Sequence, residues 1–379
     1  MTPFSIAAPG RILFGRGEAA KAPALAAAFG ARCLLVHGAD PARAAWLVAG
    51  LRAQGVEVEA LACVAEPDLP GLEQAVAQAR AFGAVCVLGL GGGAAMDMAK
   101  AIAALVPAPG GAMDHLEVVG KGLPLVAPPL PFIAIPTTAG TGAEVTKNAV
   151  IGLPGHARKV SLRDDRMLAR LAIVDPALTD RCPRAVTLTS GLDAVTQVIE
   201  PYVSVRATPF TDALARPAIG LGLGALLRLM QAEDPRARDE LAWTSLCGGL
   251  ALANGGLGAV HGLAGPIGGM TGAPHGAICG ALLAPVLAAN GARATGIAAE
   301  RLAEVRGMIA RVFRVAPGAA FETLARWARD QGLPGLVALG LAPEARAAAA
   351  EAALGSSSMK GNPVALGPRE LIGIMEAAD

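Results

Sequence analysis

Up to about residue 175, short apolar runs alternate with segments of helical periodicity, and this alternation limits the fold more than any other feature. Apolar, strand-like runs occur at 32–37, 84–90 and 130–135, with a shorter one at 56–58. Helices are predicted at 42–54, 69–82 and 94–105. Such alternation is typical of βαβ units, which build a parallel sheet covered by helices. The runs are apolar throughout, which fits strands buried on both faces.

The second half of the chain has a different texture. After Asp175-Pro176, strand-like runs become scarce and Ala-, Leu- and Arg-rich helical segments dominate. Helices are predicted at 208–232, 236–254, 276–292, 297–313, 318–331 and 343–354, with a last one from about 368. A length of 379 residues suggests two domains at roughly 100–200 residues each. We therefore predict a Rossmann-like α/β domain over 1–180 and an all-helical domain over 181–379.

Composition excludes several classes of protein. Hydrophobic residues make up 53% of the chain, charged residues 17%, and the formal net charge is +1. These values exclude a disordered chain, and the lack of a basic excess argues against a nucleic-acid partner. No charged residue occurs from Leu241 to Ala292, yet Gly, Pro, Asn and His interrupt this stretch before an apolar block of about 20 residues can form. We predict buried helices of a soluble protein and no membrane partner.

The cysteines and the N-terminus bear on the cellular compartment. The six cysteines form no C-x-x-C pair, and most lie inside apolar runs. This usage predicts buried free thiols in a reducing compartment. The N-terminus shows no basic segment followed by an apolar run, so no secretory signal is predicted. The expected localisation is the cytoplasm.

Two loops at strand ends carry the signature of a phosphate site. Gly91, Gly92 and Gly93 follow one apolar run and open a helix, with Asp97 in its first turn. Glycines allow close backbone approach, and a helix start offers free N–H groups to a pyrophosphate. These three glycines lack the G-x-G-x-x-G spacing, so on their own they also fit a tight turn. In that case Asp97 would only complement the helix dipole.

The second loop strengthens this interpretation. Thr137, Thr138 and Thr141 lie with Gly140 and Gly142 directly after the next apolar run. Ligands of open α/β sheets bind outside the carboxyl ends of the strands. Two loops of this kind at one sheet edge predict a dinucleotide site.

An aspartate and two histidines stand out in the helical half. Asp193 and Gln197 are four residues apart, so they share one face of a predicted helix. His261 and His275 lie in the uncharged stretch. An Asp and two His in apolar helices can form a divalent metal site. A buried histidine with a structural role, and a Gln197 that only forms hydrogen bonds, are the alternatives.

Four motifs in order give the chain a family resemblance. They are Gly91–Gly93 with Asp97 and Lys100, the run Pro136–Gly142, the run Gly191–Ala194, and the segment Gly258–Gly276. Together they span nearly the whole chain, which resembles the iron-containing (group III) alcohol dehydrogenase family.

The resemblance implies a two-domain enzyme with NAD or NADP in the first domain, a metal in the cleft, and at least a homodimer. It implies a divalent metal, first Fe²⁺ and otherwise Zn²⁺, and a small alcohol or aldehyde as substrate. Implied metal positions are Asp193, Gln197, His261 and His275; of these Asp193, His261 and His275 also count as catalytic. Implied cofactor-binding positions are Gly38, Gly91, Gly92, Gly93, Asp97, Thr137, Thr138, Thr141 and Lys159.

The chain departs from the family pattern at two positions. Gln197 stands where the family usually has a histidine ligand, and Gly265 stands where it usually has a histidine facing the substrate. A neutral amide oxygen is a harder and weaker ligand than imidazole, so metal should be held less tightly or a different metal favoured. Gly265 removes a proton relay and enlarges the pocket.

The expected activity is NAD(P)-dependent alcohol oxidation or aldehyde reduction, with a divalent metal polarising the substrate oxygen. A metal-independent oxo-acid reductase resembling the maleylacetate reductases is the alternative, with Arg206 or Lys159 holding a carboxylate. An inactive nucleotide-binding relative and a lyase-type synthase on the same fold are further alternatives. At the end of the first strand, many NAD-preferring relatives carry an acidic residue at the position of Gly38. Its absence, with Asp40 close by, predicts NAD use with NADP tolerated.

Overall fold

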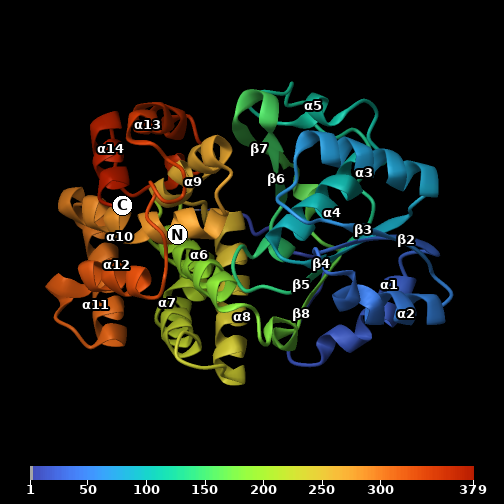
Figure 1. Cartoon of the computed structure of the whole chain (residues 1–379), viewed down its shortest axis with the longest axis horizontal. Helices are drawn as coiled ribbons and strands as arrows, with labels where there is room; N and C mark the ends of the chain where they lie inside the picture. The colour runs from blue at the N-terminus through green and yellow to red at the C-terminus, as the bar shows by residue number, and fades with distance from the viewer. Residues whose placement is uncertain (1–2) are drawn as a thin grey trace. The chain divides into compact units, whose positions relative to one another are not determined.

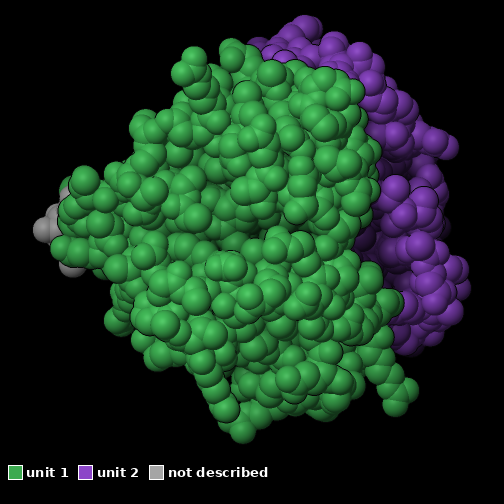
Figure 2. All heavy atoms as spheres, turned by 60° about the vertical axis from the view of Figure 1, so that its left-hand side comes forward, with its two compact units in different colours: residues 1–6, 139–141, 180–379 green, residues 7–138, 142–179 purple. Residues whose placement is uncertain are grey.

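The computed structural model describes residues 3–379, which form two compact units. The α/β unit comprises residues 7–138 and 142–179 (Figure 2, purple). The helical unit comprises residues 3–6, 139–141 and 180–379 (Figure 2, green). The loop 139–141 thus belongs to the helical unit although the strand before it belongs to the α/β unit, a division that the linear sequence did not indicate.

The α/β unit is built on a six-stranded sheet with the strand order β1-β8-β5-β4-β2-β3, in which every pairing is parallel. The strands are β1 (Ile12–Phe14), β2 (Arg32–His37), β3 (Glu57–Ala62), β4 (Cys86–Gly91), β5 (Phe132–Pro136) and β8 (Leu171–Val174). The helices are α1 (Ala22–Ala27), α2 (Ala45–Ala53), α3 (Leu69–Phe82), α4 (Gly93–Leu105) and α5 (Ala112–His115). The predicted parallel sheet is therefore confirmed.

The two faces of the sheet are covered by different helices (Figure 1). Buried side chains of α1 and α2, such as Leu47 and Leu51, pack on Leu35, Leu88 and Ile133 of the strands. Helices α3 and α4 pack against each other, and α4 lies on β4 and β5. The chain leaves β2 towards β3 but leaves β4 towards β5, so the direction of progression reverses between β2 and β4. Such a reversal opens a crevice at the carboxyl ends of the two strands.

A two-stranded antiparallel hairpin accompanies this sheet, formed by β6 (Asn148–Leu153) and β7 (Arg158–Arg163). The sequence analysis did not predict it. Its residues alternate between buried and partly exposed positions, which is the pattern of a hairpin with one covered face. The hairpin is attached to α4 by a hydrogen bond from Val150 N to Asp97 Oδ2 of 3.0 Å.

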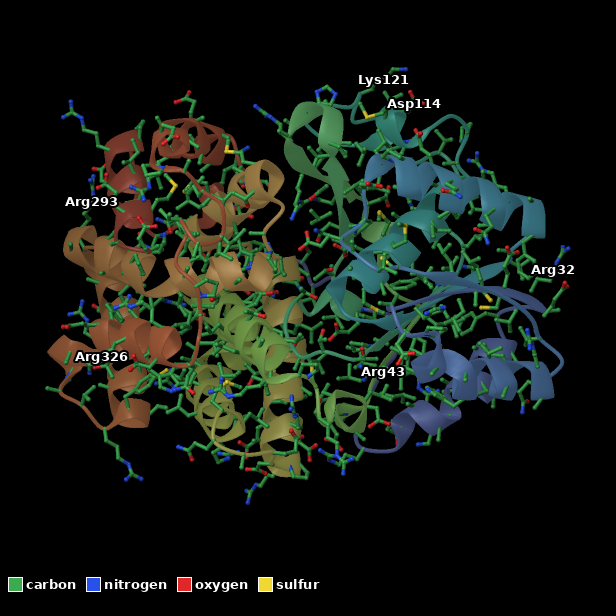
Figure 3. The ribbon with its side chains drawn as sticks, viewed as in Figure 1. Arg32, Arg43, Asp114, Lys121, Arg293 and Arg326 are labelled. Atoms are coloured by element: carbon green, nitrogen blue, oxygen red, sulfur yellow. The ribbon has the colours of Figure 1, made fainter. Side chains whose placement is uncertain are left out.

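A buried lysine fixes the segment between the threonine-rich loop and the hairpin. Lys100 on α4 is 1% exposed, and its Nζ donates to Ala143 O at 2.7 Å, Thr146 Oγ1 at 2.9 Å and Asn148 O at 2.8 Å. Burial lowers the pKa of Lys100 to about 8, although nearby Asp97 and Glu144 act in the opposite direction. Surface pairs such as Lys121 with Asp114 (Figure 3) are exposed, and such pairs contribute little.

We expect Lys100→Met to lower the free energy of unfolding by about 2 kcal/mol, because buried acceptors lose their donor while the cost of burying the charge disappears. Urea denaturation measures this change. The matched control is Lys147→Met, which removes only an ion pair with the exposed Asp165 and should cost about 0–1 kcal/mol. Equal losses in the two variants would contradict the role assigned to Lys100.

The helical unit consists of nine α-helices among the described residues. They are α6 (Arg184–Val203), α7 (Pro209–Leu229), α8 (Pro235–Gly255), α9 (Ala259–Thr271), α10 (His275–Arg293), α11 (Gly296–Phe313), α12 (Ala320–Asp330), α13 (Arg346–Leu354) and α14 (Pro368–Glu376). The all-helical character of the C-terminal half is thus confirmed. Helix α9 was not predicted, because its glycines and Pro266 oppose helix formation in isolation and only burial among neighbouring helices offsets this.

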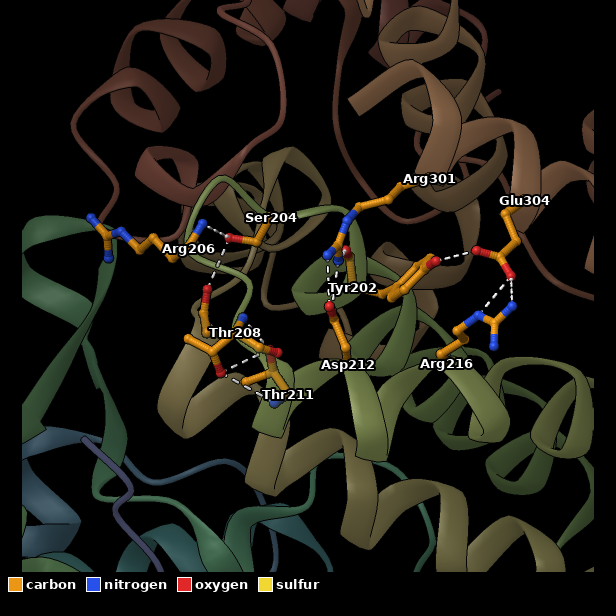
Figure 4. A network of polar contacts seen from close by, with 10 residues as sticks. Tyr202, Ser204, Arg206, Thr208, Thr211, Asp212, Arg216, Arg301 and Glu304 are labelled. Carbon is orange, nitrogen blue, oxygen red and sulfur yellow. Dashed lines mark hydrogen bonds and ion pairs between the residues drawn. The ribbon is translucent and has the colours of Figure 1, made fainter. Parts of the chain in front are cut away.

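Helices α7 and α10 are long and apolar enough to cross a membrane when judged by length and composition alone. In the structure, α7 packs against α6 and α8, and α10 packs against α6, α9 and α12. A polar network adds to this packing (Figure 4): Arg301 on α11 forms two 2.6 Å contacts with Asp212 on α7, and Glu304 binds Tyr202 on α6. Helix packing therefore accounts for the apolar character of these segments.

Candidate metal centre and cofactor site

Four potential metal ligands from three helices converge inside the helical unit. They are Asp193 of α6, His261 of α9, and His275 and Cys279 of α10, whose ligand atoms all lie within 4.8 Å of one another. Asp193 Oδ1 lies 3.3 Å from His261 Nε2 and 4.0 Å from His275 Nε2, and Cys279 Sγ lies 3.5 Å from His275 Nε2. The structure thus brings together three predicted residues, Asp193, His261 and His275, although they are up to 82 positions apart in the sequence. It adds a cysteine, Cys279, that was not predicted.

Close helix approach makes this convergence feasible. A Cβ at Gly276 would lie 2.6 Å from Thr189 O and 3.5 Å from Asp193 Cβ, so only glycine lets the start of α10 approach α6 here. A Cβ at Gly258, which precedes α9, would lie 2.9 Å from Glu200 Oε1. Glycine at these two positions places each histidine against the face of α6 that carries Asp193.

Glu200 contacts His261 at the ring nitrogen that is farther from Asp193. Its Oε2 lies 2.6 Å from His261 Nδ1, and its Oε1 accepts a hydrogen bond of 2.7 Å from Val260 N at the start of α9. A carboxylate is favoured at a helix N-terminus. With the proton on Nδ1 shared with Glu200, the lone pair of His261 Nε2 faces Asp193, which is the tautomer that a metal-ligating histidine needs.

Gln197 lies one turn after Asp193 on the buried face of α6. Its Nε2 donates to Gly140 O at 3.0 Å, which attaches the loop 139–141 to the helix. From the described part of the chain, neither Gln197 Oε1 nor Asp193 Oδ1 accepts a hydrogen bond, and both residues are at most 2% exposed. Buried oxygens in this state call for a partner, and a bound cation would supply one.

The electrostatics of the cluster also favour a cation. Burial opposes ionisation of Asp193, but the nearby imidazoles of His261 and His275 outweigh it and hold the pKa of Asp193 below its usual range. Burial likewise opposes a charged His275, yet Cys279 and Asp193 together raise the pKa of His275 to about 9. The cluster therefore attracts protons, and a divalent cation would compete with those protons for the same atoms.

The donor set fits a divalent metal. A tetrahedral site with bonds of about 2.0–2.3 Å has its donor atoms about 3.3–3.8 Å apart. Three of the six separations between the donor atoms, at 3.3, 3.5 and 4.0 Å, are close to these values, and the other three are within 4.8 Å. Carboxylate, imidazole and thiol groups all bind first-row divalent metals.

We expect Glu200→Gln to weaken Zn²⁺ binding by about 30-fold, within the range of about 10–100-fold that is typical for the outer partners of metal ligands. The amide would present Nε2 to His261 and favour the tautomer with its proton on the metal-facing nitrogen. Competition with a chromophoric chelator measures the affinity. Glu304→Gln, which weakens the contacts of Glu304 with Arg216 on α7 and Tyr202 on α6 but touches no residue of the cluster, is the matched control; unchanged affinity in Glu200→Gln would contradict the prediction.

In the α/β unit, several predicted cofactor residues gather at the point where the sheet reverses. Gly38 N, after β2, donates to Leu90 O of β4 at 3.2 Å, and Thr137 N, after β5, donates to Gly91 O at 2.8 Å. A Cβ at Gly92 would lie 3.2 Å from Thr138 Oγ1. Helix α4 starts here with Gly92 as its N-cap and no side-chain cap, so its N–H groups suit an anion.

The remaining predicted positions have other surroundings. Asp97 accepts the hydrogen bond from Val150 N and thus already holds the hairpin. Lys159 Nζ lies 2.5 Å from Glu66 Oε2. Thr141 belongs to the helical unit, in the loop that Gln197 binds. Asp40 accepts a hydrogen bond of 2.9 Å from Ala42 N and caps a short 3-10 helix rather than standing in for the residue missing at Gly38.

Two residues, Cys279 in the cluster and Glu200 beside it, were not predicted from the sequence. Cys279 was interpreted as one of several buried thiols, and Glu200 received no role. The only sequence signal was spacing: Cys279 follows His275 by one helical turn, and Glu200 follows Asp193 by two turns. Gly265 lies on α9, where an added Cβ would meet no described atom within 4 Å.

Comparisons with known proteins assign the family. The model of the iron-containing alcohol dehydrogenases matches residues 9–176, and that of the C-terminal domain of the same family matches residues 187–378. Long-chain-alcohol dehydrogenase 1 of Geobacillus thermodenitrificans is 42% identical over 60% of this chain and 57% of that protein. The NAD-dependent methanol dehydrogenase of Bacillus methanolicus is 36% identical over 65% of each chain, so less than two thirds of either relative is matched.

A solved structure supports the same assignment over the full length. The crystal structure of a 1,3-propanediol oxidoreductase superposes with a TM-score of 0.90 at 27% identity and covers 100% of both chains. The two family matches together extend over most of the 379 residues and include every residue of the metal cluster and of the sheet-edge loops. This chain belongs to the iron-containing alcohol dehydrogenase family.

Proposed function

We propose that the protein is an NAD(P)-dependent alcohol dehydrogenase or aldehyde reductase that uses a divalent metal, Fe²⁺ first and otherwise Zn²⁺. The observation that carries the proposal is the cluster formed by the buried Asp193 and His261 with the half-buried His275, in which an aspartate oxygen lacks a hydrogen-bond donor. The named relatives act on alcohols, and one of them is NAD-dependent. We propose a small alcohol or aldehyde as substrate, a homodimer or higher oligomer as assembly, and the cytoplasm as location.

In this proposal Asp193, His261 and His275 hold the metal, and the buried Gln197 Oε1 is available as a neutral donor. When bound, the metal supplies Lewis acidity towards the substrate oxygen. Asp193 contributes negative charge, and Glu200 keeps the proton of His261 on Nδ1. The glycines after β4 and the start of α4 bind the pyrophosphate of the cofactor, whose nicotinamide carries the hydride. Since Gly265 has no side chain for a relay, the proton of the alcohol leaves through water.

Elemental analysis tests the proposal directly. The protein is purified without added metal, its metal content is measured, and activity with NAD or NADP is followed after chelation and after return of Fe²⁺ or Zn²⁺. We expect near-stoichiometric metal, loss of activity on chelation, and recovery in step with metal content. Nucleotide binding without metal and without any response to metal would overturn this mechanism.

The metal-independent oxo-acid reductase receives less support from the structure. Lys159 already pairs with Glu66, and Arg206 is an exposed side chain. Oxo-acid reduction that persists after chelation would nevertheless favour this alternative, and nucleotide binding without any turnover would favour an inactive relative.

A further inference from the structure

Cys279 lies closer to potential metal ligands than a thiol with only a packing role would require. Its Sγ lies 3.5 Å from His275 Nε2 and within 4.8 Å of the ligand atoms of Asp193 and His261. It sits on the second turn of α10, directly above His275, because residues four apart share a helix face. The sulfur is therefore the fourth corner of a compact set of donor atoms.

A second, independent observation indicates that this set is built around an ion. Asp193 is 1% exposed, and among the described residues no donor forms a hydrogen bond with its Oδ1, the atom that faces both histidines. At the same time, Glu200 binds the far nitrogen of His261 and leaves the near nitrogen aimed at the same centre. Aspartate, imidazole and sulfur donor atoms thus lie within 4.8 Å of one another around an aspartate oxygen that no described donor binds, and the 3.5 Å hydrogen bond between Cys279 Sγ and His275 Nε2 is the contact that a bound metal would replace.

Gln197 cannot supply what an imidazole would supply at this centre. Its Nε2 is bound to Gly140 O, and its remaining donor is a neutral, hard amide oxygen. The thiolate of Cys279 is soft and negatively charged, so it binds Zn²⁺ and Co²⁺ well and disfavours Mg²⁺ and Mn²⁺.

On these grounds we propose that Cys279 is a metal ligand in this protein, joining Asp193, His261 and His275, and that it determines which metal is bound. Coordination converts the thiol to a thiolate and releases its proton to solvent. The inference rests on the proposed metal-dependent function, and it adds the identity of one ligand and a preference for thiophilic divalent metals over Mg²⁺ and Mn²⁺.

Co²⁺ spectroscopy tests the proposal without reference to activity. Metal-free protein is titrated with Co²⁺ alone, and bound metal is counted by elemental analysis. A thiolate ligand gives a sulfur-to-cobalt charge-transfer band in the near ultraviolet, whereas oxygen and nitrogen ligands give only the weaker visible bands. We expect the charge-transfer band in the wild type at one Co²⁺ per chain and its loss in Cys279→Ala, together with a fall in Zn²⁺ affinity of at least about 10-fold.

Two matched variants make the result specific. Cys247→Ala removes another buried thiol, on α8, and Gln197→Ala removes the amide oxygen; both should keep the charge-transfer band. A band that persists in Cys279→Ala would overturn the proposal. Stoichiometric Co²⁺ without any charge-transfer band would overturn it as well but leave the metal site of the proposed function intact. Failure to bind Co²⁺ or Zn²⁺ at all would overturn both.

Discussion

Replacing Asp193 by asparagine is expected to lower kcat/KM for alcohol oxidation by about 1,000-fold and to leave the purified protein with less than about a tenth of its metal. Asp193 is the only carboxylate among the converging donor atoms and is almost fully buried. Loss of the metal would remove Lewis-acid stabilisation of the transition state, which is worth several kcal/mol, and about 4 kcal/mol corresponds to 1,000-fold in rate. Asparagine keeps the shape of the side chain, so the loss reports on charge rather than on packing.

The measurement pairs steady-state kinetics with elemental analysis of the same preparation. Asp165→Asn, at an exposed aspartate paired with Lys147, is the control and should match the wild type in both readings. A variant at position 193 that keeps its metal and its activity would contradict the assignment of the ligand. A variant that loses its metal but remains active would favour the metal-independent reductase.

Replacing Gly38 by aspartate is expected to reduce kcat/KM with NADP by about 100-fold relative to that with NAD. Gly38 ends β2 at the reversal point of the sheet, where an acidic side chain accepts hydrogen bonds from the adenosine ribose of NAD. A 2′-phosphate at the same place would face a like charge, which costs several kcal/mol, and about 2.7 kcal/mol corresponds to 100-fold. An added Cβ at Gly38 meets no described atom within 4 Å, and its backbone is outside the left-handed region, so the substitution is tolerated.

The control for this second prediction is Gly38→Asn, which has the same size without the charge. Kinetics with both cofactors should show that asparagine retains most NADP activity while aspartate does not. If aspartate reduced the use of NAD and NADP equally, the carboxyl end of β2 would not be the place that contacts the ribose.

Local signals explain why much of the fold was predictable. The helix predicted at 69–82 matches α3, since Asp68 caps its start by accepting a hydrogen bond of 2.8 Å from Gly71 N and Gly83 ends it with a φ of 71°. These signals act within a few residues and need no tertiary context. The hairpin β6–β7 and helix α9 lack such signals, because their stability comes from burial against other elements.

The residues of the site also differ in whether the sequence alone could identify them. His261 and His275 stand out in the sequence because they interrupt an uncharged apolar stretch, and the order of the motifs added Asp193 to them. Cys279 does not stand out, because the sequence contains six cysteines and most of them lie in apolar runs. Glu200 resembles any acidic residue near the end of a helix.

The sequence by itself determined the parallel α/β unit, the helical unit, the glycine- and threonine-rich loops at one sheet edge, and three members of the metal cluster. These follow from periodicity and local motifs, which are properties of neighbouring residues. Only the tertiary structure decided that the sulfur of Cys279 lies beside the other donor atoms and that Glu200 contacts Nδ1 of His261. Both depend on how closely α9 and α10 approach α6 across Gly258 and Gly276, and such distances arise from helix packing rather than from any local stretch of the chain.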